Sequence, residues 1–176
     1  MDAKTLASAM NIPMVRAEKW ASSVTSGMTA GKIVTRLCVA AFLAQIGHES
    51  GSLVYTKELG GPTYFARYEG REDLGNTKEG DGAKFCGRGL IQVTGRDNYR
   101  KCSLALFGDD RLLSTPELLE QPEWAVRSAV WYWTKHNLNA LAEADRFTDL
   151  TRAINGGTNG LADRKERYKL ALSVLK

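Results

Sequence analysis

Cysteine is scarce in this sequence and long apolar runs are absent, and each of these features excludes a class of protein. The only cysteines are Cys38, Cys86 and Cys102. An odd number without a repeating spacing argues against a disulfide framework, and the lack of a CxxC pair argues against a zinc site of that type. No apolar stretch approaches the roughly 20 residues of a membrane-spanning helix, and the N-terminal segment lacks the apolar core of about 7–15 residues that marks a secretory signal. We therefore expect no membrane insertion, and synthesis into a cytoplasm.

Metal-binding and phosphate-binding patterns are also missing. His48 and His136 are the only histidines, and a helical zinc motif starting at His48 would need a second histidine at position 52, which is Ser52. The glycines of residues 75–89 form neither G-x-x-x-x-G-K-[ST] nor G-x-G-x-x-G. We therefore predict that the protein uses no metal and no cofactor.

The composition fits one globular domain. A chain of 176 residues with 43% hydrophobic content is long enough and apolar enough to bury a sizeable core. We expect residues 1–176 to form a single domain, with a helical segment at residues 1–28 packed on it. The formal charge of +4 favours anionic partners such as nucleic acid, anionic lipid or an acidic cell-wall polymer, although a solvated basic surface explains it equally well.

Apolar residues recur at helical spacing along most of the chain, which predicts a mainly α fold with a minor β element (α+β). Residues 75–89 hold five glycines, which is typical of turns and leaves room for a small β-hairpin. Residues 90–94 fit a short strand or a helical lead-in. Thr29 is the expected N-cap of the third helix. The predicted helices cover residues 2–10, 13–26, 30–49, 96–107, a segment starting at Pro122, residues 149–155 and a C-terminal segment from Leu161.

Glu49 is the first candidate for chemistry, because it ends an apolar helix in the stretch AQIGHESG. Partial burial and the negative end of the helix dipole would both favour a protonated carboxyl, the form that a general acid needs. The alternative is a solvated glutamate at a frayed helix end. The neighbouring His48 would orient Glu49 or cap the helix.

A second carboxylate follows on a turn-rich loop. Glu58 lies in TKELGGPT, and Glu69 in RYEGRED is a rival for the same role. Two carboxylates in different environments, one acting as acid and the other as base, are the equipment of glycoside hydrolysis. From spacing alone, each loop glutamate is equally well explained as a solvated charge.

Side-chain amides and hydroxyls are concentrated in two further stretches. Gln92, Thr94 and Asn98 lie in GRGLIQVTGRDNY, and Asn155 lies in INGGTNG. Such groups can hydrogen-bond sugar hydroxyls and N-acetyl groups, or hold a water molecule. The alternative is that they satisfy local backbone groups and that Asn155 only ends a helix.

Taken together and in order, these motifs resemble glycoside hydrolase family 19, the plant-chitinase family. The motifs are AQIGHESG, the downstream Glu58, RYEGREDLGNT, GDGAKFCGRGLIQVTGRDNY and INGG. The resemblance covers roughly residues 30–172 and is closer to the phage and prophage endolysins of that family. It implies a lysozyme-like, two-lobed helical fold with the small β-hairpin beside the active-site cleft. It also implies inverting hydrolysis of β-1,4 bonds between N-acetylated sugars.

The resemblance assigns roles to individual residues. Glu49 matches the general acid of the family, and Glu58 matches the second carboxylate of the endolysins, the base that activates water. Arg164 resembles the arginine that opens the last helix and joins a charge network near the acid. The residues expected to contact or position the substrate and its water are His48, Gln92, Thr94, Asn98, Asn155 and Arg164.

We therefore predict a phage or prophage endolysin that cleaves the glycan strands of bacterial peptidoglycan as a muramidase (lysozyme) and so lyses the host cell. The enzyme would stay in the host cytoplasm until a pore-forming phage protein opens the membrane, and would then act on the wall in the periplasm. We expect a monomer that neither binds nucleic acid nor inserts stably into the membrane. A chitinase and a lytic transglycosylase are alternatives, and a non-catalytic cell-wall-binding or DNA-binding module is an alternative of another class.

Overall fold

The computed structural model describes residues 1–176 and is mainly helical, as predicted. The chain divides into two compact units. Unit 1 comprises residues 1–54 and 132–176, and unit 2 comprises residues 55–131. None of the helices is both long enough and apolar enough to span a lipid bilayer.

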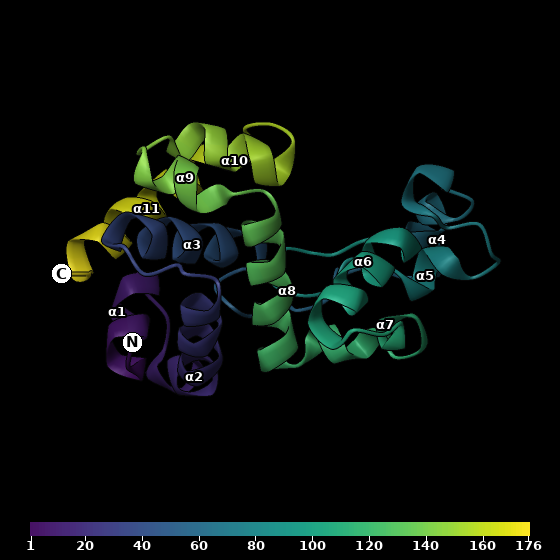
Figure 1. Ribbon diagram of the computed structural model, residues 1–176, viewed down its shortest axis with the longest axis horizontal. Coiled ribbons are helices and arrows are strands. Elements are labelled where there is room, and N and C mark those ends of the chain that lie inside the picture. Colours follow the sequence, from purple (N-terminus) through teal and green to yellow (C-terminus); the bar gives the residue numbers. More distant parts are fainter. The chain divides into compact units, whose positions relative to one another are not determined.

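Unit 1 is built around α3 (Arg36–Glu49). This helix packs against α1, α9 and α11, and Figure 1 shows α1 and α9 on opposite sides of it. Because α3 is covered from several sides, its apolar residues run around the helix instead of along one stripe, and residues 40–47 are all buried. The other helices of unit 1 are α1 (Ala3–Met10), α2 (Met14–Ala30), α9 (Leu138–Glu143), α10 (Phe147–Asn155), α11 (Leu161–Val174) and the end of α8 (Pro122–Lys135).

Large side chains from distant parts of the sequence fill the core of unit 1. Trp133 is fully buried, and its ring meets that of Phe42 edge-on with centroids 5.3 Å apart. Leu6 of α1 and Trp20 of α2 are also buried. The helices of the N-terminal segment therefore contribute to this core, and α1 packs against α2, α3 and α11.

The junction between α2 and α3 differs from the prediction. Helix α2 continues to Ala30, and Thr29 lies inside it, with its hydroxyl donating to the Thr25 carbonyl at 3.0 Å. The predicted Thr29 cap is therefore wrong. Thr35 caps α3 instead, because its side-chain oxygen accepts the Cys38 N–H at 3.3 Å and so satisfies a free donor of the first helical turn. Both threonines fit a cap by sequence, and the difference lies in where the chain turns.

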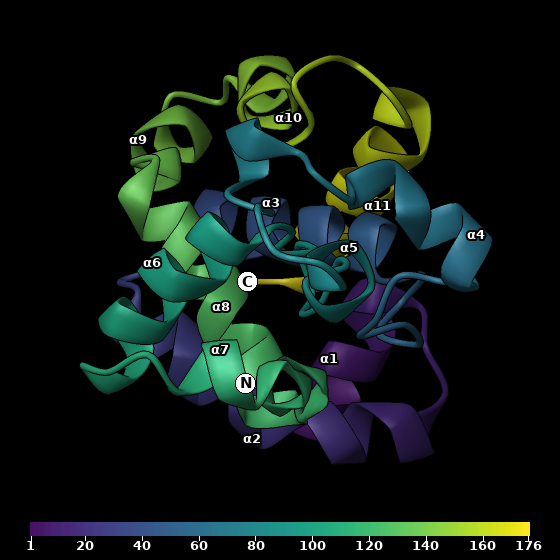
Figure 2. The same ribbon diagram turned by 90° about the vertical axis from the view of Figure 1, so that its right-hand side faces the viewer.

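Unit 2 consists of short helices around a compact apolar core. Figures 1 and 2 both show α7 beside α6, in agreement with their contacts. The buried core residues are Phe85, Val93, Tyr99, Cys102, Leu112 and Leu119. The elements are α4 (Pro62–Phe65), η1 (Ala66–Tyr68), η2 (Glu72–Leu74), α5 (Asp81–Lys84), α6 (Arg96–Phe107), α7 (Arg111–Ser114), η3 (Pro116–Glu120) and the first part of α8.

The predicted β-hairpin is not formed. Two isolated antiparallel bridges are present instead, Lys57 with Arg88 and Arg88 with Val93. The backbone turns at Gly89 (φ +82°) and again at Gln92 (φ +55°), so the chain closes a tight loop in which residues 88 and 93 exchange hydrogen bonds of 2.7 and 3.1 Å. A ladder needs several successive pairs of extended residues, and these left-handed positions prevent it. Residues 90–94 are likewise a turn, neither a strand nor a helical lead-in.

A buried ion pair joins the glycine-rich loop of unit 2 to α6. Asp81 is 2% exposed, and its Oδ2 accepts a hydrogen bond of 2.8 Å from Nε of Arg96, while Oδ1 pairs with Nη2. The Lys78 N–H also donates to this carboxylate at 3.1 Å. The Arg96 hydrogen bonds hold the pKa of Asp81 below its usual value, against the opposing effect of burial.

We expect Asp81→Ala to lower the free energy of unfolding by about 3–5 kcal/mol, because it leaves a largely buried guanidinium without its partner. Urea unfolding followed by circular dichroism would measure the loss. Since the folded-state pKa of Asp81 lies below the unfolded value, the pair stabilises the protein above the ordinary carboxyl pKa. That contribution should disappear as the pH falls through the folded-state pKa, below about pH 4. The exposed pair Asp109–Arg111 provides the control, and Asp109→Ala should leave stability nearly unchanged. Equal losses in the two variants would contradict the assignment.

Candidate active site

Glu49 ends α3 and is held there by a buried arginine. Nη2 of Arg164, on α11, donates to Oε1 of Glu49 at 2.5 Å. The arginine is completely buried, whereas 19% of the Glu49 side chain is exposed. The chain leaves α3 at once, because the buried Ser50 hydroxyl accepts the Leu53 N–H at 2.8 Å. Oε1 of Glu49 is thus held by Arg164, and Oε2 lies outside this ion pair.

Arg164 and Glu49 belong to a larger hydrogen-bonded network. Arg164 also hydrogen-bonds Oε1 of Gln45 and the Asn159 carbonyl. Gln45 is fully buried one helical turn before Glu49, and its Nε2 donates to the Thr151 hydroxyl of α10 at 2.9 Å. Residues from α3, α10 and α11 therefore share one hydrogen-bonded network, and such shared networks fix side-chain positions firmly. Gln45 was not predicted, and its position one helical turn before Glu49 was the signal available in the sequence.

His48 fastens the same end of α3 to α11. Its Nδ1 lies 2.7 Å from Oδ2 of Asp163, and Nε of Arg167 donates to that oxygen at 2.7 Å. Burial raises the pKa of Asp163, but the hydrogen bonds from Arg167 and His48 outweigh it and leave the pKa below its usual value. Gly160 packs directly on the imidazole: a Cβ there would come within 2.1 Å of the ring, on a backbone with φ +69°. These contacts anchor His48 in unit 1, and its contact with substrate stays a prediction.

Two more polar groups of unit 1, Asn155 and Tyr132, have environments that bear on the candidate site. Oδ1 of Asn155 is buried without a hydrogen-bond partner. Buried polar atoms are nearly always paired, so this oxygen is suited to a ligand or a water molecule. The pKa of Tyr132 is raised by burial and, to a smaller extent, by the negative charge of Glu49. The Tyr132 hydroxyl donates to the Ala153 carbonyl at 2.9 Å. Tyr132 was not predicted, and nothing in the local sequence pattern distinguishes it.

Glu58 occupies a hydrogen-bonded cradle in unit 2. Three groups converge on its Oε1: Nη2 of Arg67 at 2.7 Å, the Tyr68 hydroxyl at 2.9 Å and the Tyr64 hydroxyl at 3.0 Å. Oε2 accepts the Gly87 N–H at 3.0 Å. The side chain is 17% exposed. Glu58 was predicted from the sequence, but its four hydrogen-bond donors were not.

Gly87 brings Glu58 and Gln92 to the same place. A Cβ at position 87 would lie 2.6 Å from Oε1 of Gln92 and 3.3 Å from Oε2 of Glu58. Only a residue without a side chain allows these two groups to approach the backbone so closely. The structure therefore brings together two of the predicted site residues of unit 2.

Thr94 and Asn98 bond mainly to nearby backbone. The Thr94 hydroxyl donates to the Gln92 carbonyl at 3.0 Å, and Nδ2 of Asn98 donates to the Thr94 carbonyl at 2.8 Å. Nε2 of Gln92 donates to the Gly89 carbonyl at 2.9 Å. All three side chains are half-buried. Their donors are therefore used for turn and cap bonds, as the local alternative predicts, and the oxygens of the two amides take no part in these bonds.

Glu69 is bound differently from Glu58. Its Oε1 accepts the Gly80 N–H at 2.7 Å, and its Oε2 accepts the Gly82 N–H at 2.8 Å. A Cβ on Gly82 would lie 2.7 Å from this carboxylate. Both oxygens of Glu69 therefore hold the glycine-rich loop at the start of α5.

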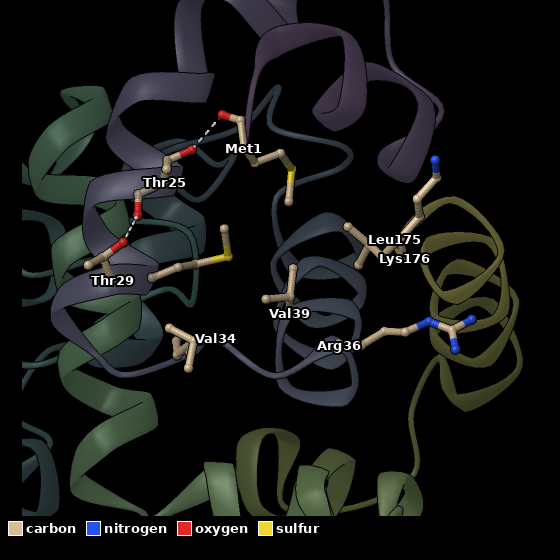
Figure 3. A pocket seen from close by; sticks show the side chains of 10 residues that line it. Met1, Thr25, Thr29, Val34, Arg36, Val39, Leu175 and Lys176 are labelled. Atoms are coloured by element: carbon tan, nitrogen blue, oxygen red, sulfur yellow. Dashed lines mark hydrogen bonds between the residues drawn. The ribbon is translucent and has the colours of Figure 1, made fainter.

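One further cavity lies in unit 1, and it does not involve the predicted site residues. A cavity of about 240 Å³ in unit 1 is lined by the ends of the chain and the α2–α3 junction, and Figure 3 shows Met1, Val34 and Arg36 around it. It contains none of the predicted site residues. No group of three or more His, Cys, Asp or Glu side chains is placed to hold a metal ion. The three cysteines are buried free thiols.

The amino-acid sequence of the chain matches a known protein family over most of the chain's length. A family model of glycoside hydrolase family 19, described as "Chitinase class I", matches residues 13–146. The chain belongs to glycoside hydrolase family 19. It is therefore a chitinase-like enzyme of the class that hydrolyses glycosidic bonds. The matched segment includes Glu49, Glu58 and the amide-rich segment, whereas Asn155 and Arg164 follow it.

Individual family 19 proteins are similar in sequence and structure. A "glycosyl hydrolase family 19 domain-containing protein" of Haemophilus influenzae is 35% identical, over 77% of this chain and 79% of its own. "Endochitinase CHI" of Arabidopsis thaliana is 31% identical over 71% of this chain, but the match spans only 44% of the plant protein. The crystal structure of chitinase C from Streptomyces griseus superposes with a TM-score of 0.75 and 26% identity, over 98% of this chain and 75% of that one. The chitinase fold of family 19 is thus shared.

Proposed function

We propose that this family 19 enzyme is an endolysin that cleaves β-1,4 bonds in the glycan strands of bacterial peptidoglycan, as a muramidase. The observation that carries the proposal is the environment of Glu49. Its carboxylate ends a rigid buried helix, is fixed through Oε1 by the buried Arg164, and is still partly exposed. A proton donor held in one place while one oxygen remains accessible is what leaving-group protonation requires.

The proposed reaction uses Glu49 as acid and Glu58 as base. Glu49 transfers a proton from Oε2 to the glycosidic oxygen as the bond to the anomeric carbon breaks. Glu58 takes a proton from a water molecule whose oxygen attacks that carbon from the opposite face. One fragment gains the proton of Glu49, the other gains the hydroxyl, and a β-linked strand first releases an α-anomer. Gln92 and Asn155 carry amide oxygens suited to N-acetyl and hydroxyl groups of the sugars.

Charge supports peptidoglycan as the polymer. The net charge of +4 favours association with an anionic cell wall. Chitin is the second candidate, because similar plant proteins are named endochitinases, and both polymers present β-1,4-linked N-acetylated sugars. The plant relatives are about twice as long as the segment that matches them, so their substrate preference carries over only as a proposal.

Parallel digestion of purified bacterial peptidoglycan and of colloidal chitin would decide between these substrates. We expect peptidoglycan fragments with reducing muramic-acid ends, detected by mass spectrometry after borohydride reduction, and little soluble sugar from chitin. Reducing glucosamine ends would identify a glucosaminidase, and anhydro-muramic ends a lytic transglycosylase. Release of chitin oligomers alone would support the chitinase. Binding to either polymer without cleavage would show a non-catalytic module.

The proposed setting follows from the proposed substrate. The enzyme would be held in the host cytoplasm and reach the periplasmic wall when a pore-forming phage protein opens the membrane. It would act as a monomer, without nucleic acid and without stable membrane insertion. A DNA-binding helix at α2 would offer only two basic residues, Arg16 and Lys19. Nη1 of Arg16 instead donates to the Ser52 carbonyl at 3.1 Å.

A further inference from the structure

The donors that surround Glu58 form one connected cluster. Nη2 of Arg67 lies 2.7 Å from Oε1 of Glu58, 2.5 Å from the Tyr64 hydroxyl and 2.7 Å from the Tyr68 hydroxyl. The guanidinium also lies over both aromatic rings, 3.7 Å from the centroid of Tyr64 and 4.7 Å from that of Tyr68. Its orientation is therefore set by two rings and three oxygens. We call Arg67, Tyr64 and Tyr68 together the Arg67 clamp.

The clamp treats the two oxygens of Glu58 unequally. Oε1 accepts hydrogen bonds from all three clamp residues, which saturates the lone pairs of one carboxylate oxygen. Oε2 accepts only the Gly87 N–H, so it retains a lone pair. Oε2 is also the oxygen that lies beside Gly87 and hence near the Gln92 amide. Only Oε2 can accept a proton from a water molecule in this arrangement.

We propose that Arg67 is a positioning residue for the hydrolysis, which engages Oε1 of Glu58 together with Tyr64 and Tyr68 and thereby presents Oε2 as the basic atom. The inference rests on the proposed role of Glu58 as the base. Arg67 itself acts only through the carboxylate. A planar guanidinium stacked on aromatic rings is not replaced by lysine, so the clamp requires arginine at position 67.

The Arg67 clamp is not explained by a contribution to folding stability. About half of the Arg67 side chain is exposed, and exposed ion pairs contribute little to folding. An arrangement of three donors around one carboxylate oxygen is nevertheless geometrically demanding. We therefore expect loss of Arg67 to reduce turnover far more than it reduces stability, because misplacing a reacting group by about 1 Å can cost on the order of 10²-fold in rate.

The test measures kcat and KM for Arg67→Ala, Arg67→Lys, Glu58→Gln and the double variant Glu58→Gln/Arg67→Ala. The substrate is the soluble N-acetylated oligosaccharide that the digestion shows to be cleaved. We expect Arg67→Ala to lower kcat by about 10²-fold with KM within about threefold, and Arg67→Lys to recover only part of the loss. In the Glu58→Gln background, Arg67→Ala should change kcat by less than about threefold, because it has no base left to position. Arg71→Ala removes an exposed arginine of the same loop, paired with Asp73, and should leave kcat unchanged.

Each other outcome has a definite meaning. A raised KM with normal kcat for Arg67→Ala would make Arg67 a substrate contact and overturn the proposal. A further loss of about 10²-fold in the Glu58→Gln background would show an effect independent of Glu58 and also overturn it. Normal turnover for Arg67→Ala, together with an inactive Glu58→Gln variant, would remove the clamp and keep the base. Normal turnover for Glu58→Gln would overturn both.

Discussion

Glu49→Gln is expected to lose about 10²–10⁴-fold of the lytic activity, the usual cost of removing general acid assistance. The amide carbonyl can still accept the hydrogen bond from Arg164, so the side chain should stay in place. It has no transferable proton, however, and the leaving oxygen would depart without protonation. Initial rates of peptidoglycan turbidity loss, compared with the parent protein at equal folded concentration, would measure the effect.

The stability of the Glu49→Gln variant requires its own measurement. Arg164 is fully buried and would lose a charged partner, although Gln45 and the Asn159 carbonyl remain as acceptors. We expect a destabilisation of about 1–3 kcal/mol, so activity should be assayed well below the midpoint of thermal unfolding. Glu143→Gln is the matched control, because Glu143 is an exposed glutamate at the end of another helix of unit 1, α9. A folded Glu49→Gln variant that lyses like the control would remove Glu49 from the mechanism.

Local features of the sequence predicted most helices and the two candidate carboxylates, Glu49 and Glu58. Apolar periodicity located α6 and α8, and the stretch before Glu49 correctly indicated a buried helix that ends at a carboxylate. These predictions succeeded because they depend on residues close together in the chain. The predicted hairpin failed because glycine content indicates turning but does not give the sign of φ at Gly89 and Gln92.

The surroundings of the carboxylates could not be predicted from local spacing. Arg164 reaches Glu49 across 115 residues of sequence, and only the resemblance to family 19 indicated it. Arg67 and Tyr68 follow Glu58 by nine and ten residues, but they meet it through short helical turns whose geometry the sequence pattern leaves undefined. Gln45 is one helical turn from Glu49, yet its role depends on a hydrogen bond to Thr151 from another helix. Contacts between distant elements decide what each charged residue does.

Glu58→Gln should reduce turnover by about 10²–10⁴-fold, and Glu69→Gln should reduce it by less than about threefold. The two variants form a matched pair within unit 2. Each carboxylate accepts backbone N–H groups, so either substitution sets an amide NH₂ against a donor and should cost a similar ~1–3 kcal/mol of stability. The difference lies in the groups around each carboxylate. Glu69 is held by the backbone N–H groups of Gly80 and Gly82, whereas Glu58 lies beside Gly87 and is oriented by three side-chain donors, from Arg67, Tyr64 and Tyr68.

Rates at equal folded fraction, with urea unfolding of both variants, would separate catalysis from stability in this pair. Early proton NMR of the products adds a test of what Glu58 does. An α-anomer that appears before mutarotation is expected if Glu58 activates water, because attack then occurs opposite the leaving group. A β-anomer as the first product would make the second carboxylate a nucleophile. If Glu69→Gln is the variant that loses turnover, the base is Glu69, and the backbone contacts of its carboxylate must open during the reaction. If both variants turn over normally, neither loop carboxylate activates water, and Glu49 would be left as the only carboxylate in the mechanism, as in a lytic transglycosylase.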